Sequence, residues 1–245
     1  MKIQFIGTGN MDSERFNACI LVNDCILIDA PPGVGKTLLK NRFDIRKIKI
    51  ILITHQHIDH YFDLPILIRE LSNCHIPEIH ILASQSLIDN FETLMRLAFP
   101  DVYQEILQPI RVHFTILKEY GNYSLLNFHI HSIPVTHGNL DSCFGFILKN
   151  NETSIGYSGD ASYTKEIEYI CRNCNSIILD STKLIGDRDH MGLNNIYDIC
   201  KKYPQKAVFI THLSEQINTK KIKKYTNLII SNDNKHYKIN KNKEK

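Results

Sequence analysis

Short apolar runs alternate with amphipathic stretches along most of this chain of 245 residues. The short runs are rich in Ile, Val, Leu and Phe, and they predict strands over residues 3–6, 19–22, 25–29, 50–54, 79–82, 110–117, 128–135, 143–149, 153–159, 176–180 and 207–211. Residues 227–239 predict two more strands, joined by a hairpin turn at NDNK (232–235). Apolar residues at three- and four-residue spacing predict helices over 34–43, 63–72, 84–99, 163–173 and 193–203.

The order of these elements indicates the fold class. Predicted strands follow one another in pairs or trios, most clearly over 109–158, and then alternate with helices. This mixture predicts an α/β fold in which two mixed sheets pack face to face with helices outside, rather than one doubly wound parallel sheet. Because no linker or low-complexity segment interrupts the chain, we expect a single domain over 1–239 and a frayed Lys-rich tail over 240–245.

The composition favours a protein of a reducing compartment. A hydrophobic content of 43% is enough for a substantial core, and no apolar run approaches the roughly 18 residues of a membrane span. Seven cysteines, an odd number, lie mostly inside apolar runs, where they are typical of small core residues. Cys171 and Cys174 form a single CxxC, which lacks the second pair of a zinc ribbon. We therefore expect a cytoplasmic protein with no membrane segment.

The charge distribution gives little support for a nucleic-acid partner. The formal net charge is +3, because 29 basic residues are nearly matched by 26 acidic ones. The excess of lysine lies after residue 220, where it is more typical of a solvated surface than of a phosphate-binding one.

A phosphate-binding loop is one interpretation of DAPPGVGKTLL at 29–39. Its Ala30, Gly35, Lys36 and Thr37 satisfy the relaxed pattern of such loops, and IILD at 177–180 is similar to the strand that ends in a metal-holding Asp in nucleotide triphosphatases. Two prolines at 31 and 32, however, remove backbone N–H donors from a loop that must offer them to phosphates. The pattern therefore does not predict a triphosphatase.

A second motif predicts metal chemistry. HQHIDH places three histidines and a carboxylate within six residues, at the end of the apolar run 50–54: His55, His57, Asp59 and His60. In an extended segment, positions 55 and 57 point the same way, and positions 59 and 60 follow a turn. Imidazole nitrogen and carboxylate oxygen are ligands that zinc, manganese and iron accept. The cluster is therefore a candidate metal site.

Further candidate ligands follow other predicted strands. His137 follows SIPV, Asp160 follows TSIGYS, and His212 follows AVFI. Strand ends are where α/β proteins gather ligands from distant parts of the chain. These three residues complete a set of seven candidate metal ligands.

This set resembles the metallo-β-lactamase superfamily, whose HxHxDH hallmark stands here as HQHIDH. The resemblance extends from GTGN through DAPPG, HQHIDH, THG, SGD and DST to THLS. It implies an αββα sandwich and two divalent ions, either zinc or manganese. One ion would be held by His55, His57 and His137, the other by Asp59, His60 and His212, with Asp160 bridging both. It also implies that Asp29 accepts a hydrogen bond that orients one of the histidine ligands.

Within this superfamily, DHMGLNNI is similar to the phosphodiesterase branch. In that branch a histidine at the position of His190, 22 residues before His212, contacts phosphate or assists the leaving group. The resemblance implies attack by a metal-bridging hydroxide on a phosphodiester, with Asp59 orienting the hydroxide and His190 acting on the leaving oxygen.

The substrate expected from the resemblance is small. The tRNA 3′-processing enzymes carry a long basic arm between the equivalents of His137 and Asp160, and here only 23 positions separate these residues. A Cys-rich insertion of the phosphonate-pathway enzyme is also absent. What remains resembles compact cyclic-nucleotide phosphodiesterases, including phage anti-Pycsar enzymes, which act in the host cytoplasm and form homodimers. Five aromatic residues are candidates for stacking on a base but are more typical of core or interface positions: Tyr61, Phe62, Phe91, Phe99 and Tyr103.

Three alternatives stay open at this point: a tRNA 3′-processing endoribonuclease, a thioester or lactone hydrolase, and a ligand-binding protein without catalysis. The other histidines have no predicted role. His129 and His131 are predicted to lie on a solvated strand face, and His75, His80, His113 and His236 have no partners in sequence.

Overall fold

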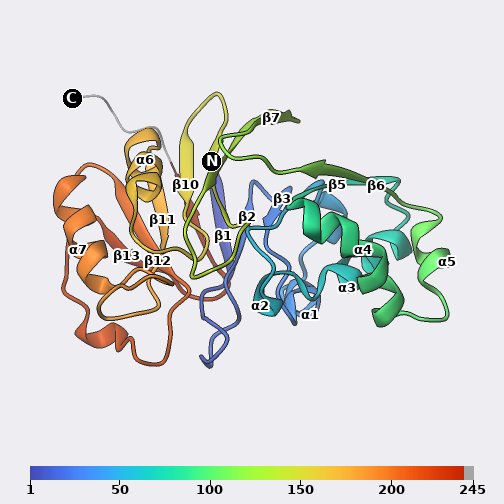
Figure 1. Ribbon diagram of the computed structural model, residues 1–245, viewed down its shortest axis with the longest axis horizontal. Helices are drawn as coiled ribbons and strands as arrows, with labels where there is room; N and C mark the ends of the chain where they lie inside the picture. The colour runs from blue at the N-terminus through green and yellow to red at the C-terminus, as the bar shows by residue number, and fades with distance from the viewer. Residues whose placement is uncertain (240–245) are drawn as a thin grey trace.

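The computed structural model describes residues 1–239, so the tail predicted over 240–245 lies outside the described residues. Two sheets of seven strands each form the centre of the molecule (Figure 1). The first has the order β14 (Lys235–Lys238), β1 (Lys2–Gly7), β2 (Cys19–Val22), β3 (Ile26–Ile28), β4 (Ile50–Leu52), β5 (Glu78–Ala83) and β6 (Arg111–Ile116). The second has the order β13 (Leu228–Ile230), β12 (Ala207–Thr211), β11 (Ser176–Asp180), β10 (Ser154–Tyr157), β9 (Phe144–Lys149), β8 (Phe128–Pro134) and β7 (Asn122–Leu125).

Each sheet is part parallel and part antiparallel. Strands β3 to β6 run parallel to one another, and so do β10 to β13. All other neighbouring pairs are antiparallel. Parallel strands need long crossovers, and these crossovers supply the helices. The prediction of two mixed sheets is therefore confirmed.

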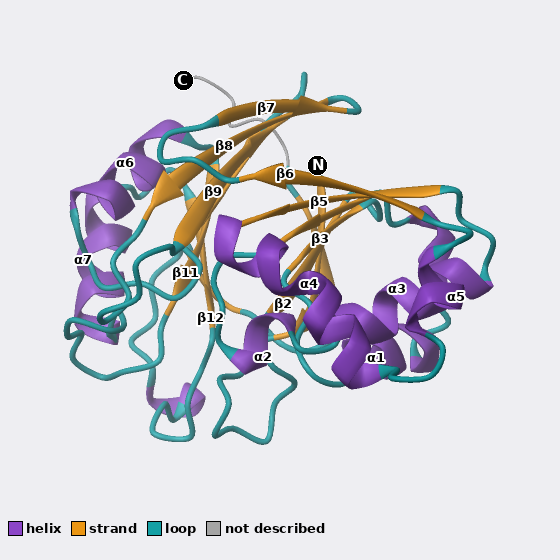
Figure 2. Cartoon of the chain, turned by 45° about the vertical axis from the view of Figure 1, so that its right-hand side comes forward, coloured by secondary structure: helices purple, strands orange, loops and turns teal. Residues whose placement is uncertain are grey.

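Helices cover the outer face of each sheet (Figures 1 and 2). The first sheet carries α1 (Val34–Lys40), α2 (Ile58–Tyr61), α3 (Leu64–Asn73), α4 (Gln85–Ala98) and α5 (Tyr103–Leu107), together with the 3₁₀ turn η1 (Ile45–Lys47). The second carries α6 (Lys165–Asn173) and α7 (Leu193–Lys202), and η2 (Thr219–Lys221) follows β12. No helix among residues 1–239 is long and apolar enough to cross a bilayer.

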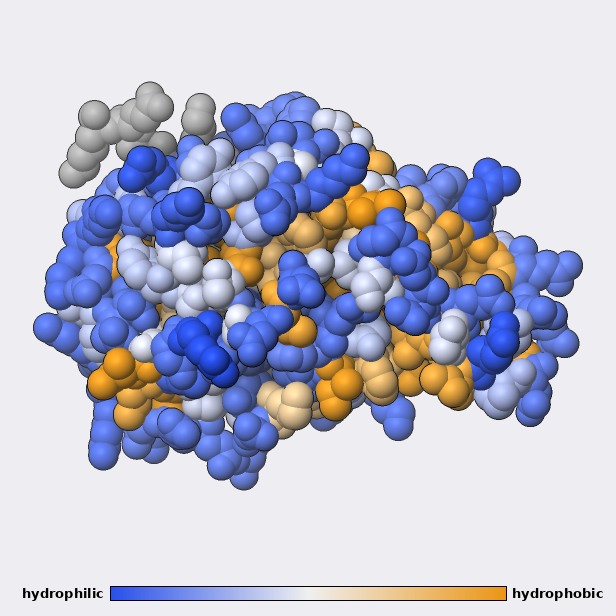
Figure 3. Space-filling model, in the orientation of Figure 1, coloured by the Kyte–Doolittle hydropathy of each residue, from blue (hydrophilic) through white to orange (hydrophobic). Residues whose placement is uncertain are grey.

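The layers are held together by three apolar clusters. One lies under α1 to α5, one lies under α6 and α7, and the third fills the space between the sheets. In the third cluster the rings of Phe5 on β1 and Phe209 on β12 lie 5.7 Å apart, and neither side chain is more than 1% exposed. The surface in Figure 3 is mainly hydrophilic over α6 and α7, and apolar residues gather on the half that carries α3 to α5. The burial confirms the amphipathic patterns in the sequence.

The predicted hairpin at 232–235 is wrong. Strands β13 and β14 belong to different sheets, because β13 pairs with β12 and β14 pairs with β1. The turn between them is anchored by Asp233, whose carboxylate accepts hydrogen bonds from the Thr8 hydroxyl at 2.7 Å and the Phe16 amide at 2.9 Å. The same turn residues occur in hairpins and in connections between two sheets, so the sequence pattern does not distinguish the two. The strand β7 and the short helices α2 and α5 also have no counterpart among the predicted elements.

Candidate metal centre

All seven predicted ligands meet at one end of the two sheets. His55 follows β4, His57 to His60 form the start of α2, and the second sheet contributes His137 after β8, Asp160 after β10 and His212 after β12. Six of the seven are buried, and His57 is half-buried. Consecutive parallel strands end at the same edge of a sheet, which is why residues so distant in sequence come together.

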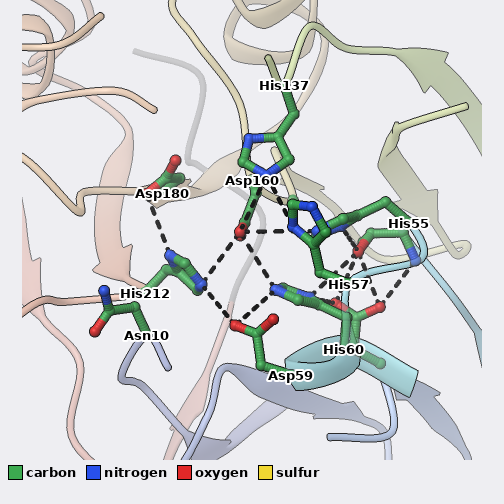
Figure 4. Close-up of polar contacts among 12 residues, drawn as sticks. Asn10, His55, His57, Asp59, His60, His137, Asp160, Asp180 and His212 are labelled. Atoms are coloured by element: carbon green, nitrogen blue, oxygen red, sulfur yellow. Dashed lines mark hydrogen bonds and ion pairs between the residues drawn. The ribbon is translucent and has the colours of Figure 1, made fainter. Parts of the chain in front are cut away.

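Asp160 lies at the centre of this group (Figure 4). Its Oδ2 is 3.2 Å from Nε2 of His212 and 3.3 Å from Nε2 of His60. The same oxygen is 3.9 Å from Nε2 of His55 and 4.0 Å from Nε2 of His137. One carboxylate oxygen therefore faces histidines from both predicted ligand sets.

The side chains form five overlapping groups of three whose ligand atoms lie within 4.8 Å of one another. Two of these groups are the sets implied by the sequence: His55, His57 and His137, and Asp59, His60 and His212. A third, His55, His60 and Asp160, connects the two sets. The remaining two contain His190, with His137 and Asp160 or with Asp180 and His212.

The donor atoms that face inward have no other partner. Within residues 1–239, Nε2 of His55, His60 and His212 and Oδ1 of Asp160 are buried without a hydrogen bond. Unpaired polar atoms in a protein interior cost about 1–3 kcal/mol each, so native proteins rarely keep them without a ligand or ion. Imidazole nitrogens and a carboxylate are the donor set of a divalent transition metal. The residues present therefore fit a metal ion.

Without a metal ion, the pKa shifts favour the metal-binding protonation states of His55 and Asp160 and oppose that of His60. Burial lowers the pKa of His55 well below its ordinary value, so its ring is neutral. Burial opposes the charge on Asp160, but His212 and His60 hold its pKa well below the usual range. At His60 burial is outweighed by Asp160 and Asp29, which raise the pKa of the ring well above its ordinary value. The carboxylates thus favour positive charge at this point of the site.

The outward nitrogens of four histidines are held by the protein. Nδ1 of His60 lies 2.9 Å from Asp29 Oδ2, and Nδ1 of His137 lies 2.7 Å from the Asp189 carbonyl oxygen. Nδ1 of His55 contacts the Thr54 hydroxyl at 3.0 Å. Nδ1 of His212 contacts the Thr182 hydroxyl at 2.7 Å. With Nδ1 engaged, Nε2 of each ring is left to face the centre.

His190 stands beside the ligands and is held separately. Its Nδ1 lies 2.8 Å from Asp180 Oδ2, and its ring centroid is 4.7 Å from that of His137 and 5.3 Å from that of His212. Burial lowers the pKa of this ring, but the hydrogen bond and charge of Asp180 outweigh burial and raise the pKa to about 9.

A cleft of about 680 Å³ opens onto this centre. Its lining comes from the loop after β1, the segment 137–140, the loop that carries Thr182 and His190, and the residues that follow β12. Gly138 has φ +57°, and a Cβ there would lie 2.7 Å from Asp189 Oδ1. The positive φ favours glycine at this position, where the His137 loop meets the His190 loop.

Other residues singled out in the sequence lie away from the cleft. His129 and His131 face Ser124 and the Gly121 carbonyl, and the rings of His80 and His113 stack on each other at 4.8 Å. All seven cysteines are free, including Cys171 and Cys174. None of the five aromatic residues considered for base stacking lines the cleft: Tyr61, Phe62, Phe91, Phe99 and Tyr103.

The apparent phosphate-binding loop is engaged in folding. Thr37 is buried and its hydroxyl donates to the Gly33 carbonyl at 2.9 Å, whereas Lys36 is exposed. Asp63 accepts a hydrogen bond from the Gly35 amide at 3.1 Å, which ties the start of α1 to α3. Asp29, just before this loop, makes the predicted contact with a candidate ligand histidine, His60.

Sequence reasoning missed Thr54, Thr182 and the role of Asp180. The signal for Thr54 is its position directly before His55 in the motif. Nothing in the sequence links Thr182 to His212, which is 30 residues further along the chain.

Known proteins share this fold. The model of the β-lactamase superfamily domain matches residues 25–213, so the chain belongs to that family. Ribonuclease Z of Staphylococcus epidermidis RP62A is 24% identical over 295 residues, covering 97% of this chain and 96% of that protein. Ribonuclease Z of Picrophilus torridus is 24% identical over 269 residues, covering 89% and 87% of the two chains.

Solved structures agree on the fold. Human tRNase Z, short form, superposes with a TM-score of 0.77 at 20% identity, covering 98% of this chain and 99% of its own. A diphosphatase from the PhnP family gives 0.76 at 19% identity, with 99% of both chains covered. The metallo-β-lactamase fold protein YhfI from Bacillus subtilis gives 0.77 at 16% identity, covering 97% and 99%. The predicted αββα sandwich is confirmed, and the chain is a hydrolase of the metallo-β-lactamase superfamily.

Proposed function

We propose that this chain is a metal-dependent phosphodiesterase acting on a small phosphodiester, such as a cyclic phosphate or cyclic nucleotide. The observation that carries the proposal is the position of His190. Asp180 holds its Nδ1 at 2.8 Å, and the ring lines the cleft beside both ligand sets. A thioester hydrolase has less need of a separate proton donor there, because a thiolate leaves readily, whereas an alkoxide leaving a phosphodiester requires a proton.

In this proposal the metal ligands divide as the sequence implies. His55, His57 and His137 would hold one divalent ion, Asp59, His60 and His212 would hold the second, and Asp160 would be available to both sets. Zinc and manganese suit these donors. Two such ions, when bound, supply a nucleophilic water at neutral pH and neutralise charge that grows on phosphoryl oxygens.

The protein's own groups orient the reactants. Asp59 Oδ2 lies 3.6 Å from Nε2 of both His60 and His212, so this carboxylate is placed to accept a hydrogen bond from the attacking water. His190, with Nδ1 bound to Asp180, has Nε2 left for the substrate. A protonated His190 therefore donates its Nε2 proton to the departing oxygen.

The size of the cleft and the length of one connection support a small substrate. A volume of about 680 Å³ falls in the range of small-molecule sites. Between His137 and Asp160 the chain forms a short loop over 138–143, β9, a turn at 150–153 and β10, which leaves no room for a long inserted arm. The alignment with the Staphylococcus epidermidis ribonuclease Z spans 295 residues, more than the 245 of this chain, so that enzyme has segments that this chain lacks.

A second candidate is endonucleolytic processing of tRNA 3′ ends. It is favoured by the relatives named ribonuclease Z, whose alignments cover nearly the whole chain. A near-neutral net charge and the missing arm weigh against it.

The proposal also includes a cytoplasmic location, a single domain over 1–239 and a homodimer. Sedimentation of the purified protein tests the homodimer.

The decisive experiment is a substrate panel on zinc- or manganese-loaded protein. It contains bis-p-nitrophenyl phosphate, 2′,3′- and 3′,5′-cyclic nucleotides, a tRNA precursor with a 3′ trailer, a lactone and a thioester. We expect hydrolysis of the small phosphodiesters and of at least one cyclic nucleotide. Cleavage of the precursor alone would establish the second candidate. Activity only on the lactone or thioester would overturn both.

A further inference from the structure

Thr182 is a buried residue of the cleft whose hydroxyl oxygen lies within 3 Å of three polar groups and 3.4 Å from a fourth, Nδ1 of His190. Its Oγ1 lies 2.7 Å from Asp180 Oδ1, 2.7 Å from Nδ1 of His212 and 2.9 Å from the His212 carbonyl oxygen. The side chain is 6% exposed, so water does not replace these partners. One hydroxyl therefore connects a carboxylate to a candidate metal ligand.

The proton positions at this hydroxyl follow from its partners. Asp180 Oδ1 and the His212 carbonyl oxygen only accept, so the single proton of Thr182 goes to one of them. In either case a lone pair of Oγ1 faces Nδ1 of His212, which must then carry the ring proton. Nε2 of His212 is consequently bare, and it points at Asp160 Oδ2, 3.2 Å away, without a hydrogen bond to any described residue.

The same carboxylate also holds His190. Asp180 Oδ2 accepts from Nδ1 of His190 at 2.8 Å and from the Ala161 amide at 3.2 Å, while Oδ1 accepts from the Thr182 amide at 3.0 Å. Asp180 is fully buried. Thr182 and His190 are thus held by the two oxygens of one carboxylate, which fixes the spacing between His212 and His190.

The arrangement occurs a second time in the first sheet. The Thr54 hydroxyl lies 3.0 Å from Asp29 and 3.0 Å from Nδ1 of His55, and Asp29 Oδ2 contacts His60. In both sheets a buried Asp at a strand end accepts from a Thr hydroxyl and also holds a His ring, although the Thr54 hydroxyl lies 3.0 Å from both oxygens of Asp29. The same arrangement at two places indicates that both threonines orient a candidate ligand histidine through its Nδ1.

We propose that Thr182 is a positioning residue whose hydroxyl fixes His212 in the tautomer with Nδ1 protonated and Nε2 free, and so supports one metal position selectively. The ligand role of His212 rests on the proposed function. The hydroxyl matters through its lone pair, so a serine suffices and a valine of the same shape does not.

The chain offers a matched control at Thr211. Its hydroxyl is also buried beside His212, but Oγ1 has no hydrogen-bond partner among residues 1–239. Thr211→Val removes a buried hydroxyl from the same neighbourhood without removing a contact to His212. Thr182→Val keeps the backbone amide at position 182, so the loop retains the hydrogen bond from this amide to Asp180 Oδ1.

The test is a zinc titration of the metal-free protein against a chromogenic chelator, without any substrate. We expect Thr182→Val to weaken one of two zinc equivalents by about 10- to 100-fold and to leave the other unchanged. Thr182→Ser and Thr211→Val should bind both equivalents like the unaltered protein. Long-range ¹H–¹⁵N spectra of the metal-free proteins should show the Nδ1–H tautomer of His212 in the unaltered protein, in Thr182→Ser and in Thr211→Val. Thr182→Val should not show it. Thr182→Ala serves in its place if Thr182→Val does not fold.

Equal zinc affinity in Thr182→Val and the unaltered protein would overturn the inference, as would equal losses in Thr182→Val and Thr211→Val. Fewer than two zinc equivalents in the unaltered protein would also overturn it. If the unaltered protein binds two zinc ions but hydrolyses no phosphodiester, the proposed function fails while the titration still decides the role of Thr182.

Discussion

The carboxylate Oδ2 of Asp29 lies 2.9 Å from Nδ1 of His60, and neither side chain has any exposed surface. Asp29 reaches this position from a left-handed backbone conformation, with φ 66°, directly after β3. A non-glycine residue in this conformation stores strain, which proteins tolerate mainly at functional sites. His212, with φ 56°, has the same conformation directly after β12.

Replacing Asp29 with Asn should weaken both folding and metal binding. The carboxylate accepts from the Thr54 amide at 2.8 Å, from the Thr54 hydroxyl and from His60, and an amide group would turn a donor toward one of these donors. A buried donor without an acceptor costs about 1–3 kcal/mol. Urea unfolding of the metal-free protein measures this loss, and a zinc titration should show about 10- to 100-fold weaker binding. Asp24→Asn, near the surface, is the control, and identical behaviour of the two variants would contradict the prediction.

His190→Ala should slow turnover and leave the metal content intact. A proton donor to the leaving group contributes about 10²- to 10⁴-fold, so kcat with a cyclic nucleotide should fall by this factor. Bis-p-nitrophenyl phosphate should lose much less, because p-nitrophenolate leaves without a proton. His131→Ala, which changes a histidine outside the cleft, should have no effect. Equal losses for both substrates, or loss of bound zinc, would assign His190 a different role.

Lys36→Ala should leave activity and stability unchanged. Lys36 is exposed on α1, and substitutions of such residues usually change stability by less than about 0.5 kcal/mol. A nucleotide triphosphatase would instead lose its activity with this lysine. Phosphodiesterase and ATPase rates of the two proteins decide between these outcomes, and an ATPase activity that depends on Lys36 would revive the phosphate-binding loop.

Removal of metal should abolish activity and lower the melting temperature. In the absence of ions, Nε2 of His55, His60 and His212 and Oδ1 of Asp160 have no hydrogen-bond partner among the described residues. Binding to the folded state stabilises it by about 2.7 kcal/mol when free zinc is 100 times its Kd. Thermal melts over a zinc series should therefore shift upward with concentration, and Asp160→Ala should shift much less. A melting temperature that does not change with zinc concentration would contradict the prediction that the folded protein binds zinc at this site.

Much of the fold was predictable from local pattern. The buried face of α3 consists of Leu64, Leu67, Ile68 and Leu71, which have the three- and four-residue spacing visible in the sequence. The pairing of β13 and β14 was not predictable, because a turn sequence specifies a reversal and not the partner of each strand. Which sheet edge each strand joins depends on contacts such as that of Asp233 with Thr8, 225 positions away.

The candidate site divides in the same way. The sequence by itself determined the ligand types, because the chemistry of HQHIDH and of His137, Asp160 and His212 is contained in the residues and their order. Thr precedes His three times, at 54, 136 and 211, yet only the Thr54 hydroxyl contacts the ring of the histidine that follows it. For His212 the partner is Thr182 instead: the hydroxyl of Thr211 makes no hydrogen bond to a described residue, and β11, which precedes Thr182, lies alongside β12. Hydrogen bonds act over about 3 Å in space, and only packing of the strands decides which distant hydroxyl comes that close.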